Sequence, residues 1–463
     1  MSQDTICAIA TAPGGAIGII RVSGPEAITV TDRIFIPATG PRLTERRPYT
    51  LTFGQIISTE KEVIDEVLVS LFRAPHSYTG ENSVEISCHG SSYILQQVMQ
   101  LLIQNGCRAA GPGEYTQRAF LNGKMDLSQA EAVADLIAST SAATHRMAMN
   151  QMRGGFSREL SQLRDQLLHL TSLMELELDF SDHEDLEFAN RSELASLVSH
   201  IECAIVNLTN TFSTGNALKN GVPVAIVGET NAGKSTLLNA LLNEERSIVS
   251  DIHGTTRDVI EDTLCLEGIT FRFIDTAGIR QTADAIENMG IKRSFQKLEQ
   301  ASIVLWVIDA TQANEQYSQL TTDILPRCIE KHLILVLNKV DLVPSGSPLP
   351  IFDNLPKDVD IIPISAMRKD GIITLQQKLV SFVSLPNFSQ NDIVVSNVRH
   401  YEALLHALTA IRRVQRGLAL GNACDLVSQD LRECLHYLGA IVGGTIDANE
   451  VLSNIFNHFC IGK

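Results

Sequence analysis

The chain has 463 residues, of which 44% are hydrophobic and 19% are charged, and its formal net charge is −16 at pH 7. This length exceeds one ordinary hydrophobic core, so we expect a globular protein with about three domains. The acidic balance argues against broad, nonspecific binding to nucleic acid, which needs a positive face, but it leaves room for a local basic patch.

The first residues lack the basic, apolar and small-residue pattern of a secretory leader, and no apolar run approaches about 18 residues. We therefore expect a cytoplasmic protein with no membrane partner. The nine cysteines are scattered without a C-x-x-C pair, which argues against a disulfide framework or a zinc ribbon.

Residues 1–118 alternate short apolar runs with glycine turns, which predicts a small α/β or α+β domain. The apolar runs cover residues 17–22, 51–57, 67–72 and 84–87. The glycine loops are Tyr78-Thr79-Gly80-Glu81, Cys88-His89-Gly90 and Gly111-Pro112-Gly113-Glu114. Such corners allow either the close approach of a ligand or tight packing of the chain, and the residues alone leave both interpretations open.

Two arginine clusters are candidates for a local basic patch. They are Arg42, Arg46 and Arg47 near the N-terminus, and Arg412, Arg413 and Arg416 near the C-terminus. The ordinary alternative for each cluster is a solvated loop or helix face.

The pattern becomes helical over residues 119–218. Ser128 and Glu131 have the spacing of a capping box, ahead of an alanine-rich run that reaches about residue 150. Apolar residues then recur from Phe156 to Met174 at alternating steps of four and three, a stripe that needs a partner helix. After an acidic interruption we expect a third helix over roughly 191–214.

Residues 228–235, GETNAGKS, are the most informative stretch of the chain. They follow the apolar run 222–227 and precede a helical pattern, which is the context that a phosphate-binding P-loop requires. The glycines let backbone N–H groups point inward, and Lys234 can reach the β- and γ-phosphates. Ser235 can offer its hydroxyl to Mg²⁺.

Two later motifs would complete the metal and γ-phosphate contacts. Asp275-Thr276-Ala277-Gly278 ends an apolar strand, so its carboxylate can hold the metal through water and its glycine amide can meet the γ-phosphate. The stretch 254–258 is the expected switch I, with Thr256 as the second magnesium ligand. Ile279 stands where Ras-like proteins have a water-orienting Gln, so hydrolysis must be arranged differently here.

Two further motifs predict that the base is guanine. Asp341 of Asn338-Lys339-Val340-Asp341 can accept both N–H groups of the guanine edge, a contact that adenine cannot make. Ser365-Ala366-Met367 is expected to back the base. Each motif alone could be an ordinary strand-end turn, but all of them in this order favour a GTPase.

The helical pattern resumes after residue 383, with one apolar stripe at 404–418 and another at 451–459. Helices on both sides of an α/β unit suggest one helical domain with the G domain inserted, because joining the halves would bury both stripes. The chain ends in Cys460-Ile461-Gly462-Lys463, which is not a prenylation box.

With the G-domain motifs, the TGE and PGE loops and the terminal CIGK, the sequence resembles the MnmE (TrmE) family of tRNA-modification GTPases over essentially its whole length. This family is part of the TrmE-Era-EngA group of potassium-dependent GTPases. The resemblance implies a multidomain fold of three parts: an α/β N-terminal folate-binding and dimerisation domain, an all-α helical domain, and an inserted Ras-like α/β P-loop G domain. The bounds expected are 1–118 for the first, 119–218 and 384–463 for the helical domain, and 219–383 for the G domain.

The resemblance also implies an activity and partners. A homodimer would hydrolyse GTP in a potassium-dependent way. With the flavoprotein MnmG (also called GidA), in a heterotetramer, it would add an aminomethyl or carboxymethylaminomethyl group at C5 of the wobble uridine of certain tRNAs. The one-carbon unit would come from 5-formyl- or methylene-tetrahydrofolate.

The family's functional positions match the following residues of this sequence. GTP contacts are implied for Asn231, Ala232, Gly233, Lys234, Ser235, Thr236, Ser250, Asp251, Ile252, His253, Gly254, Thr255, Thr256, Asp275, Thr276, Ala277, Gly278, Asn338, Lys339, Asp341, Ser365, Ala366 and Met367. Potassium would be held by Asn231, Ser250, Ile252 and Thr255, and magnesium by Ser235 and Thr256. Folate contacts are implied for Arg21, Glu85, Lys124 and Lys463.

Two catalytic positions complete the resemblance. Glu287 is expected to orient the attacking water, while the potassium ion neutralises charge between the β- and γ-phosphates as an arginine finger would. Cys460 is expected beside the folate pocket, where it could act covalently or only pack.

The sequence departs from the family at Thr230, where many members have Pro, and at His253, where they have a small residue. His253 lies in the expected potassium loop, so cation affinity and selectivity are the quantities in question. The main alternative function is a regulatory ribosome-assembly or RNA-binding GTPase without modification activity, but neither a KH-like G-x-x-G module nor a second P-loop is present. The other alternative, a folate-binding scaffold without catalysis, is disfavoured by the intact phosphate site.

Overall fold

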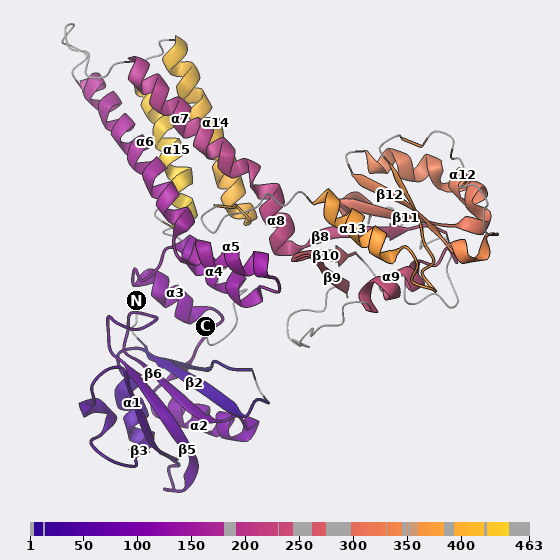
Figure 1. Cartoon of the computed structure of the whole chain (residues 1–463). Helices are drawn as coiled ribbons and strands as arrows, with labels where there is room; N and C mark the ends of the chain where they lie inside the picture. The colour runs from indigo at the N-terminus through magenta and orange to yellow at the C-terminus, as the bar shows by residue number, and fades with distance from the viewer. Residues whose placement is uncertain are drawn as a thin grey trace. The chain divides into compact units, whose positions relative to one another are not determined.

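The computed structural model describes residues 4–12, 14–179, 191–229, 231–243, 262–274, 298–329, 331–344, 350, 352, 355–356, 359–383, 393–420 and 424–443. The chain divides into two compact units (Figure 1). The first unit comprises 1–138, 148–203 and 403–463, and the second comprises 139–147 and 204–402. None of the helices in the described ranges is long and apolar enough to cross a membrane.

The N-terminal part of the first unit is a sheet of seven strands in the order β3-β4-β5-β6-β2-β1-β7. The strands are β1 (Ile6–Ile9), β2 (Ile17–Ser23), β3 (Phe35–Pro37), β4 (Thr50–Ile57), β5 (Val63–Phe72), β6 (Ser83–His89) and β7 (Arg108–Ala109). Neighbouring strands are antiparallel except β1 and β7. Every second side chain, such as Val67 and Val69 of β5, packs into one core with α1 (Ala27–Ile34) and α2 (Ser92–Gln104). The predicted mixture of strands and helices is confirmed, with the mainly antiparallel pairing of the α+β alternative, and the four predicted runs are β2, β4, β5 and β6.

The helical part of the first unit joins segments that are far apart in the sequence. Its helices are α3 (Glu114–Leu121), α4 (Leu127–Ala138), α6 (Gly155–Asp179), the first part of α7 (Arg191–Asn210), most of α14 (Val398–Leu420) and α15 (Cys424–Val442). The predicted stripe on α6 is buried at Leu160, Leu163 and Leu167, and α15 lies beside α6 as its partner (Figure 1). The predicted stripe at 451–459 lies outside the described residues.

The capping box predicted at Ser128 and Glu131 is wrong. The structure forms it two residues earlier: Gln129 N donates to Asp126 Oδ1 at 2.9 Å, and Asp126 N donates to Gln129 Oε1 at 2.9 Å. Asp126 takes the N-cap because its carboxylate reaches the unpaired N–H groups of the first turn, while Ser128 lies inside the helix and donates to Asp126.

The predicted alanine-rich helix is in fact two helices, because α4 ends at Ala138 and α5 (Ala142–Met152) starts anew. A reciprocal pair of hydrogen bonds caps the second start: Thr144 N donates to Ser141 Oγ at 3.2 Å and Ser141 N donates to Thr144 Oγ1 at 3.1 Å. The third predicted helix likewise ends at Asn210 and is followed by α8 (Phe212–Asn220).

The second unit contains a sheet of six strands in the order β13-β12-β11-β8-β10-β9. The strands are β8 (Val222–Val227), β9 (Asp262–Leu266), β10 (Ile269–Phe273), β11 (Ile303–Asp309), β12 (His332–Asn338) and β13 (Asp360–Pro363). All neighbours are parallel except β9 and β10. The carboxyl ends of β8, β11, β12 and β13 therefore meet at one edge, where ligands of open α/β sheets bind.

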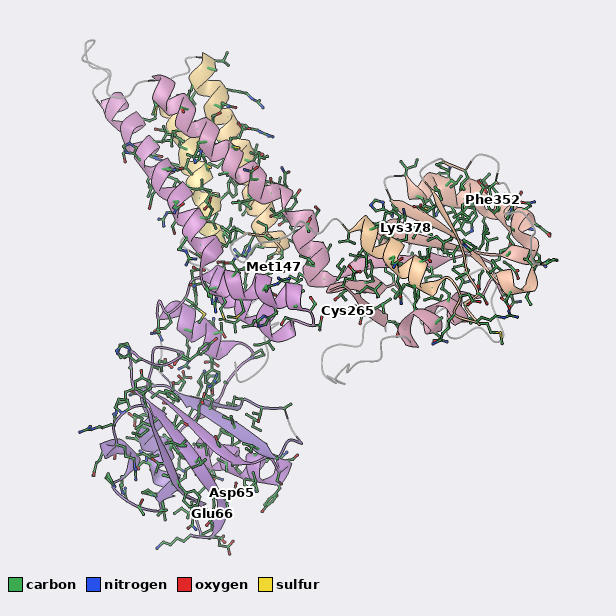
Figure 2. The ribbon with its side chains drawn as sticks, viewed as in Figure 1. Asp65, Glu66, Met147, Cys265, Phe352 and Lys378 are labelled. Carbon is green, nitrogen blue, oxygen red and sulfur yellow. The ribbon has the colours of Figure 1, made fainter. Side chains whose placement is uncertain are left out.

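Apolar cores lie on both faces of this sheet, as its parallel order requires. The helices of the unit include α9 (Lys234–Asn243), α12 (Ala313–Ile324) and α13 (Ile372–Phe382), and Lys378 of α13 pairs with Asp360 at 2.7 Å (Figure 2). Trp306, the one tryptophan of the sequence, is fully buried in β11, and its ring stacks on Tyr317 with 5.2 Å between centroids.

Candidate functional site

The loop after β8 has a backbone that only glycine allows at two positions. Gly228 has φ +146°, and a Cβ there would lie 2.1 Å from Val307 O. Gly233 has φ +94°, and a Cβ there would lie 2.1 Å from Asn338 Nδ2. Helix α9 begins directly afterwards at Lys234, so the N–H groups of its first turn point toward the loop and favour an anion there.

Lys234 holds its ammonium group inside this loop. Its Nζ donates to Gly228 O at 2.8 Å and to Glu229 O at 2.7 Å. Burial lowers the pKa of Lys234, and the negative charge of Glu229 opposes this change. A phosphate oxygen could replace either carbonyl as the acceptor, so the loop fits a polyphosphate.

Asn338 ties three predicted motifs together. Its side chain is almost fully buried, and its Nδ2 donates to Ala232 O in the P-loop at 2.9 Å. Its Oδ1 accepts a hydrogen bond from Ala366 N at 3.0 Å. One side chain therefore joins the phosphate loop, the end of β12 and the loop after β13.

Lys339, next in the chain, adopts the left-handed conformation with φ +64° and contacts a residue that the sequence analysis missed. Its Nζ lies 2.7 Å from Asp309 Oδ2, at the carboxyl end of β11. Burial would raise the pKa of Asp309, but hydrogen bonds from Lys339 and Thr311 outweigh it, and the pKa is lowered. The signal that could have identified Asp309 is an acid directly after a fully apolar strand at this edge of the sheet.

The residues predicted to hold the base lie at the same edge. Asp341 belongs to the short 3₁₀ helix η4 (Val340–Leu342), and the nearest cation to its carboxylate is Arg368 Nε at 3.6 Å. Ser365 is buried, with its Oγ accepting from Arg368 N at 3.2 Å, whereas Met367 is 86% exposed. The edge thus offers a carboxylate for a base and an apolar side chain beside it.

The other predicted GTP and metal positions divide into two groups. Asn231 is exposed with φ +66°, Ser235 is half-buried in the first turn of α9, and Thr236 is exposed. Outside the described residues lie Ser250, Asp251, Ile252, His253, Gly254, Thr255, Thr256, Asp275, Thr276, Ala277, Gly278, Glu287, Cys460 and Lys463, with Thr230.

The predicted folate contacts Arg21 and Glu85 are cross-strand neighbours on β2 and β6. Arg21 Nε and Nη2 lie 2.9 Å and 2.8 Å from Glu85 Oε1. The guanidinium carbon is 5.6 Å from the ring centroids of both Tyr78 and Tyr115. Burial raises the pKa of both tyrosines, so their hydroxyls stay neutral at physiological pH.

Lys124 reaches the same region from the turn between α3 and α4. Its Nζ donates to Pro75 O at 3.1 Å, and Asn122 Nδ2 donates to Thr79 O at 2.7 Å. The loop that contains Pro75, Tyr78 and Thr79 therefore contacts both Arg21 and Lys124, and the structure brings the three described folate candidates around it.

Arg118 of α3 joins two of the glycine loops. It donates to Glu81 of the TGE loop at 3.2 Å and to Glu114 of the PGE loop at 3.0 Å. It also donates to Asp4 Oδ1 at 2.7 Å and to Asp4 O at 2.8 Å. Arg108 holds the pKa of Asp4 below its ordinary value, with a further contribution from Arg118. Both glutamates thus serve tight packing of the loops, an outcome that the sequence left open.

The third glycine loop is also tightly packed. A Cβ on Gly90 would lie 1.9 Å from Gly15 O. Next to it, His89 Nδ1 lies 2.7 Å from Oδ1 of Asp65, which Figure 2 labels on β5, and His89 N donates to Asp65 Oδ2 at 2.8 Å. The loop is therefore held on both sides by backbone contacts and a carboxylate.

The end of the described chain lies close to these loops. A Cβ on Gly443, just after α15, would lie 2.8 Å from the ring of Phe120 and 3.1 Å from Leu127 Cβ. Gly443 therefore lies beside α3, the helix that carries Tyr115 and Arg118.

Comparison with known proteins gives matches along the whole chain. Residues 127–460 match the family model described as the MnmE helical domain, and residues 5–124 match the one described as the GTP-binding protein TrmE N-terminus. The tRNA modification GTPase MnmE of Phocaeicola vulgatus is 64% identical, over 100% of this chain and 99% of that protein. The protein of the same name from Bacteroides fragilis is 65% identical over 100% of both chains.

A solved structure gives a weaker match. A variant of Aquifex aeolicus Era bound to GDP·AlF4⁻ is 30% identical over 41% of this chain and 66% of that chain. Its TM-score is 0.28, which is too low to carry a structural argument.

Proposed function

Because this chain belongs to the MnmE family of tRNA modification GTPases, we propose that it binds and hydrolyses GTP at the edge of the six-stranded sheet and acts in the modification of tRNA. The observation that best supports a nucleotide site is the pair of hydrogen bonds by which the Asn338 amide joins the P-loop to the loop after β13. A phosphate cradle and a base site are thereby fixed relative to one another.

The described residues have distinct tasks in this proposal. Lys234 exchanges its two loop carbonyls for phosphate oxygens, and the first-turn amides of α9 bind the same anion. Ser235, with Thr256, would hold Mg²⁺, which would supply positive charge to neutralise the phosphates. Asp341 accepts the two N–H groups of guanine, which gives the site its preference over adenine.

Hydrolysis is proposed to depend on potassium. Asn231 supports this proposal because its side chain is exposed on the P-loop, held by a left-handed backbone. Ser250, Ile252 and Thr255 would complete the ion's ligands, and Glu287 would orient the attacking water in place of the Gln that Ile279 replaces. The ion would supply the charge that an arginine finger supplies in other GTPases.

The N-terminal domain is proposed to bind 5-formyl- or methylene-tetrahydrofolate through Arg21, Glu85, Lys124 and Lys463. Since Glu85 already neutralises Arg21, this pair offers a donor and an acceptor without net charge, which suits a pterin edge. Lys124 is then the cation for the glutamate tail. Sixteen residues lie between Gly443 and Cys460, which is enough chain to reach across the domain, since an extended chain spans about 3.3 Å per residue.

The proposed assembly is a cytoplasmic homodimer that modifies the wobble uridine at C5 together with MnmG (GidA), in a heterotetramer. The 219–383 G domain is proposed to be inserted in a helical domain formed by 119–218 and 384–463. The division of the chain supports the insertion, because segments on both sides of the second unit belong to the first.

The experiment that tests this function measures GTP turnover of the full chain in K⁺ and in Na⁺ at equal ionic strength, for wild type and Asn231→Ala. We expect faster turnover in K⁺ and loss of that advantage in the variant. Equal rates in both salts would refute the potassium role, and no turnover in either would refute the GTPase.

A second measurement addresses the modification. With MnmG, folate and tRNA present, mass spectrometry of the wobble nucleoside should detect the added group. An unmodified uridine in the presence of active GTP turnover would favour the alternative, a regulatory GTPase that binds RNA without modifying it.

A further inference from the structure

We propose that an arginine surface on the N-terminal domain, formed by Arg42, Arg46, Arg47 and Arg73, binds the phosphate backbone of tRNA. This inference rests on the proposed function in tRNA modification and adds the location of an RNA contact. The surface is formed by residues outside the nucleotide site, and through Tyr49 it adjoins the loop that contacts Arg21.

The segment that carries three of these arginines is fixed at its centre. It contains the short 3₁₀ helix η1 (Leu43–Glu45), in which Leu43 is fully buried. Leu43 N donates to the buried Asp32 Oδ1 at 2.8 Å. Arg42 and the pair Arg46 and Arg47 therefore extend from either side of an anchored point, which reduces the entropy lost when they bind a ligand.

The hydrogen bonds of these arginines leave their charge largely uncompensated. Arg73 Nη2 donates to Thr44 O at 2.7 Å and to Arg46 O at 3.3 Å, while Arg46 Nε donates to Pro41 O at 2.9 Å. These acceptors are neutral carbonyls. Among the residues that the structure describes, no carboxylate forms an ion pair with Arg46, Arg47 or Arg73.

Arg42 has one distant partner, and the surface has one exposed acid. Arg42 Nη1 lies 3.8 Å from Asp32 Oδ2, and its side chain is 75% exposed. Glu45 is the exposed acid of the same segment. Four guanidinium groups against these two carboxylates make a locally positive surface on a chain of net charge −16.

The second arginine cluster of the sequence differs in this respect. Arg412 pairs with Glu202 at 2.8 Å, and Arg413 pairs with Asp430 at 2.7 Å and with Glu433. These contacts hold α14 against α7 and α15, so they are explained by helix packing. Two of the three arginines of this second cluster are therefore neutralised by carboxylates, whereas the N-terminal cluster keeps most of its charge.

An exposed aromatic ring beside the arginines favours RNA over an acidic protein. Tyr49 is 63% exposed and has φ +60°, which is rare for a bulky residue. Its hydroxyl donates to His76 O at 2.7 Å, and its ring meets Phe72 edge-on, 6.0 Å between centroids. A ring held in this way offers a face on which an unpaired base can stack, while the arginines contact phosphates.

The test measures tRNA binding by the full chain, by fluorescence anisotropy, at a series of salt concentrations. We expect the double variant Arg42→Gln with Arg47→Gln to bind tRNA at least tenfold more weakly. The slope of log K against log salt should fall by about 0.7 to 0.9 for each phosphate that the variant no longer neutralises. Tyr49→Ala should weaken binding with an unchanged slope, because stacking releases no counterions.

The matched control is the double variant Arg412→Gln with Arg416→Gln, which changes the net charge equally on an exposed face of α14. We expect wild-type tRNA affinity and salt slope for this control, and unchanged GTP turnover for all variants. An equal loss in both double variants would attribute the effect to net charge and overturn the proposal. Unchanged tRNA binding by the N-terminal double variant would also overturn the proposal. That conclusion would hold even if the variant lost dimerisation or MnmG binding, because the proposal concerns tRNA binding alone.

One further outcome separates this inference from the proposed function. If the wild-type chain bound no tRNA, alone or with MnmG, the arginine surface and the proposed role in tRNA modification would both be refuted. Binding by wild type that the N-terminal variants leave unchanged would refute the arginine surface alone.

Discussion

Arg118 gives the most direct test of how the N-terminal loops are held, through the substitution Arg118→Ala. Its side chain is 12% exposed and contacts Asp4, Glu81 and Glu114. Removing one partner of a buried charge network costs about 3–5 kcal/mol, because the remaining charges lose their compensation. Arg108 still pairs with Asp4 and Glu114, so we expect the lower end, about 3 kcal/mol.

The assay is hydrogen exchange of the amides of β1, β2 and β6 in the full chain, with the amides of β11 as an internal reference. Protection in the N-terminal sheet should fall by about 3 kcal/mol, roughly a 150-fold change in exchange, while β11 is unchanged. Arg108→Ala is the matched control. Its side chain is 50% exposed, so its ion pairs should contribute about 1 kcal/mol or less.

The effect should also depend on pH. The pKa of Asp4 is lowered from 3.8 and that of Glu114 from 4.5, so their contribution is fully present above these values. It is lost as the pH falls through the lowered values, so wild type and Arg118→Ala should converge only once the pH lies below both lowered pKa values. A loss under 1 kcal/mol at pH 7, or a difference that persists at acid pH, would refute the reasoning.

Three further predictions concern the second unit. Gly233→Ala should weaken GTP binding by roughly 5- to 150-fold, measured as the nucleotide Kd, because its Cβ would meet Asn338 Nδ2 at 2.1 Å on a backbone with φ +94°, a strain of about 1–3 kcal/mol. Asp341→Asn should weaken GTP binding by about 1–3 kcal/mol and tighten the binding of xanthosine triphosphate, in which an oxygen replaces the guanine amino group. A GTP affinity equal to that of the wild type would contradict the proposed base contact. Burial raises the pKa of Cys328 to about 11, so at pH 8 about a thousandth of it is thiolate. Mass spectrometry after iodoacetamide treatment should find the exposed Cys265 modified before Cys328, and faster alkylation of Cys328 would contradict its burial.

The backbone of the loop after β8 was predictable because phosphate binding constrains such a loop locally. A P-loop needs glycine where φ is positive and a strand before it. Both requirements are visible in one short stretch of sequence, the apolar run 222–227 followed by the loop that contains Gly228 and Gly233. The parallel order of the strands then brings Asn338 and Ser365 to the same edge without further information. Asp309 was missed because its partner Lys339 is 30 residues away and is chosen by strand order.

The N-terminal loops illustrate what a single sequence does not specify. The TGE and PGE glutamates are evident as motifs, yet their shared partner is Arg118, which is also bound to Asp4 at a separation of 114 residues. Such a choice depends on how β1, α3 and the loops pack, and no local pattern encodes it. The misplaced capping box has a simpler cause: Ser128 and Asp126 both have capping side chains, and only the geometry of the first turn distinguishes them.

The position of Trp306 makes the chain's ultraviolet fluorescence a report on one domain. Because it is the sequence's one tryptophan and is fully buried in β11, emission excited at the red edge of the absorption band comes from the G domain alone. Its strand ends at Asp309, beside Asn338 in the sheet register, so nucleotide binding should alter the signal without any added dye. Fluorescence can thus follow the melting of the second unit and its ligand exchange in the full chain, without a contribution from any other tryptophan of this chain.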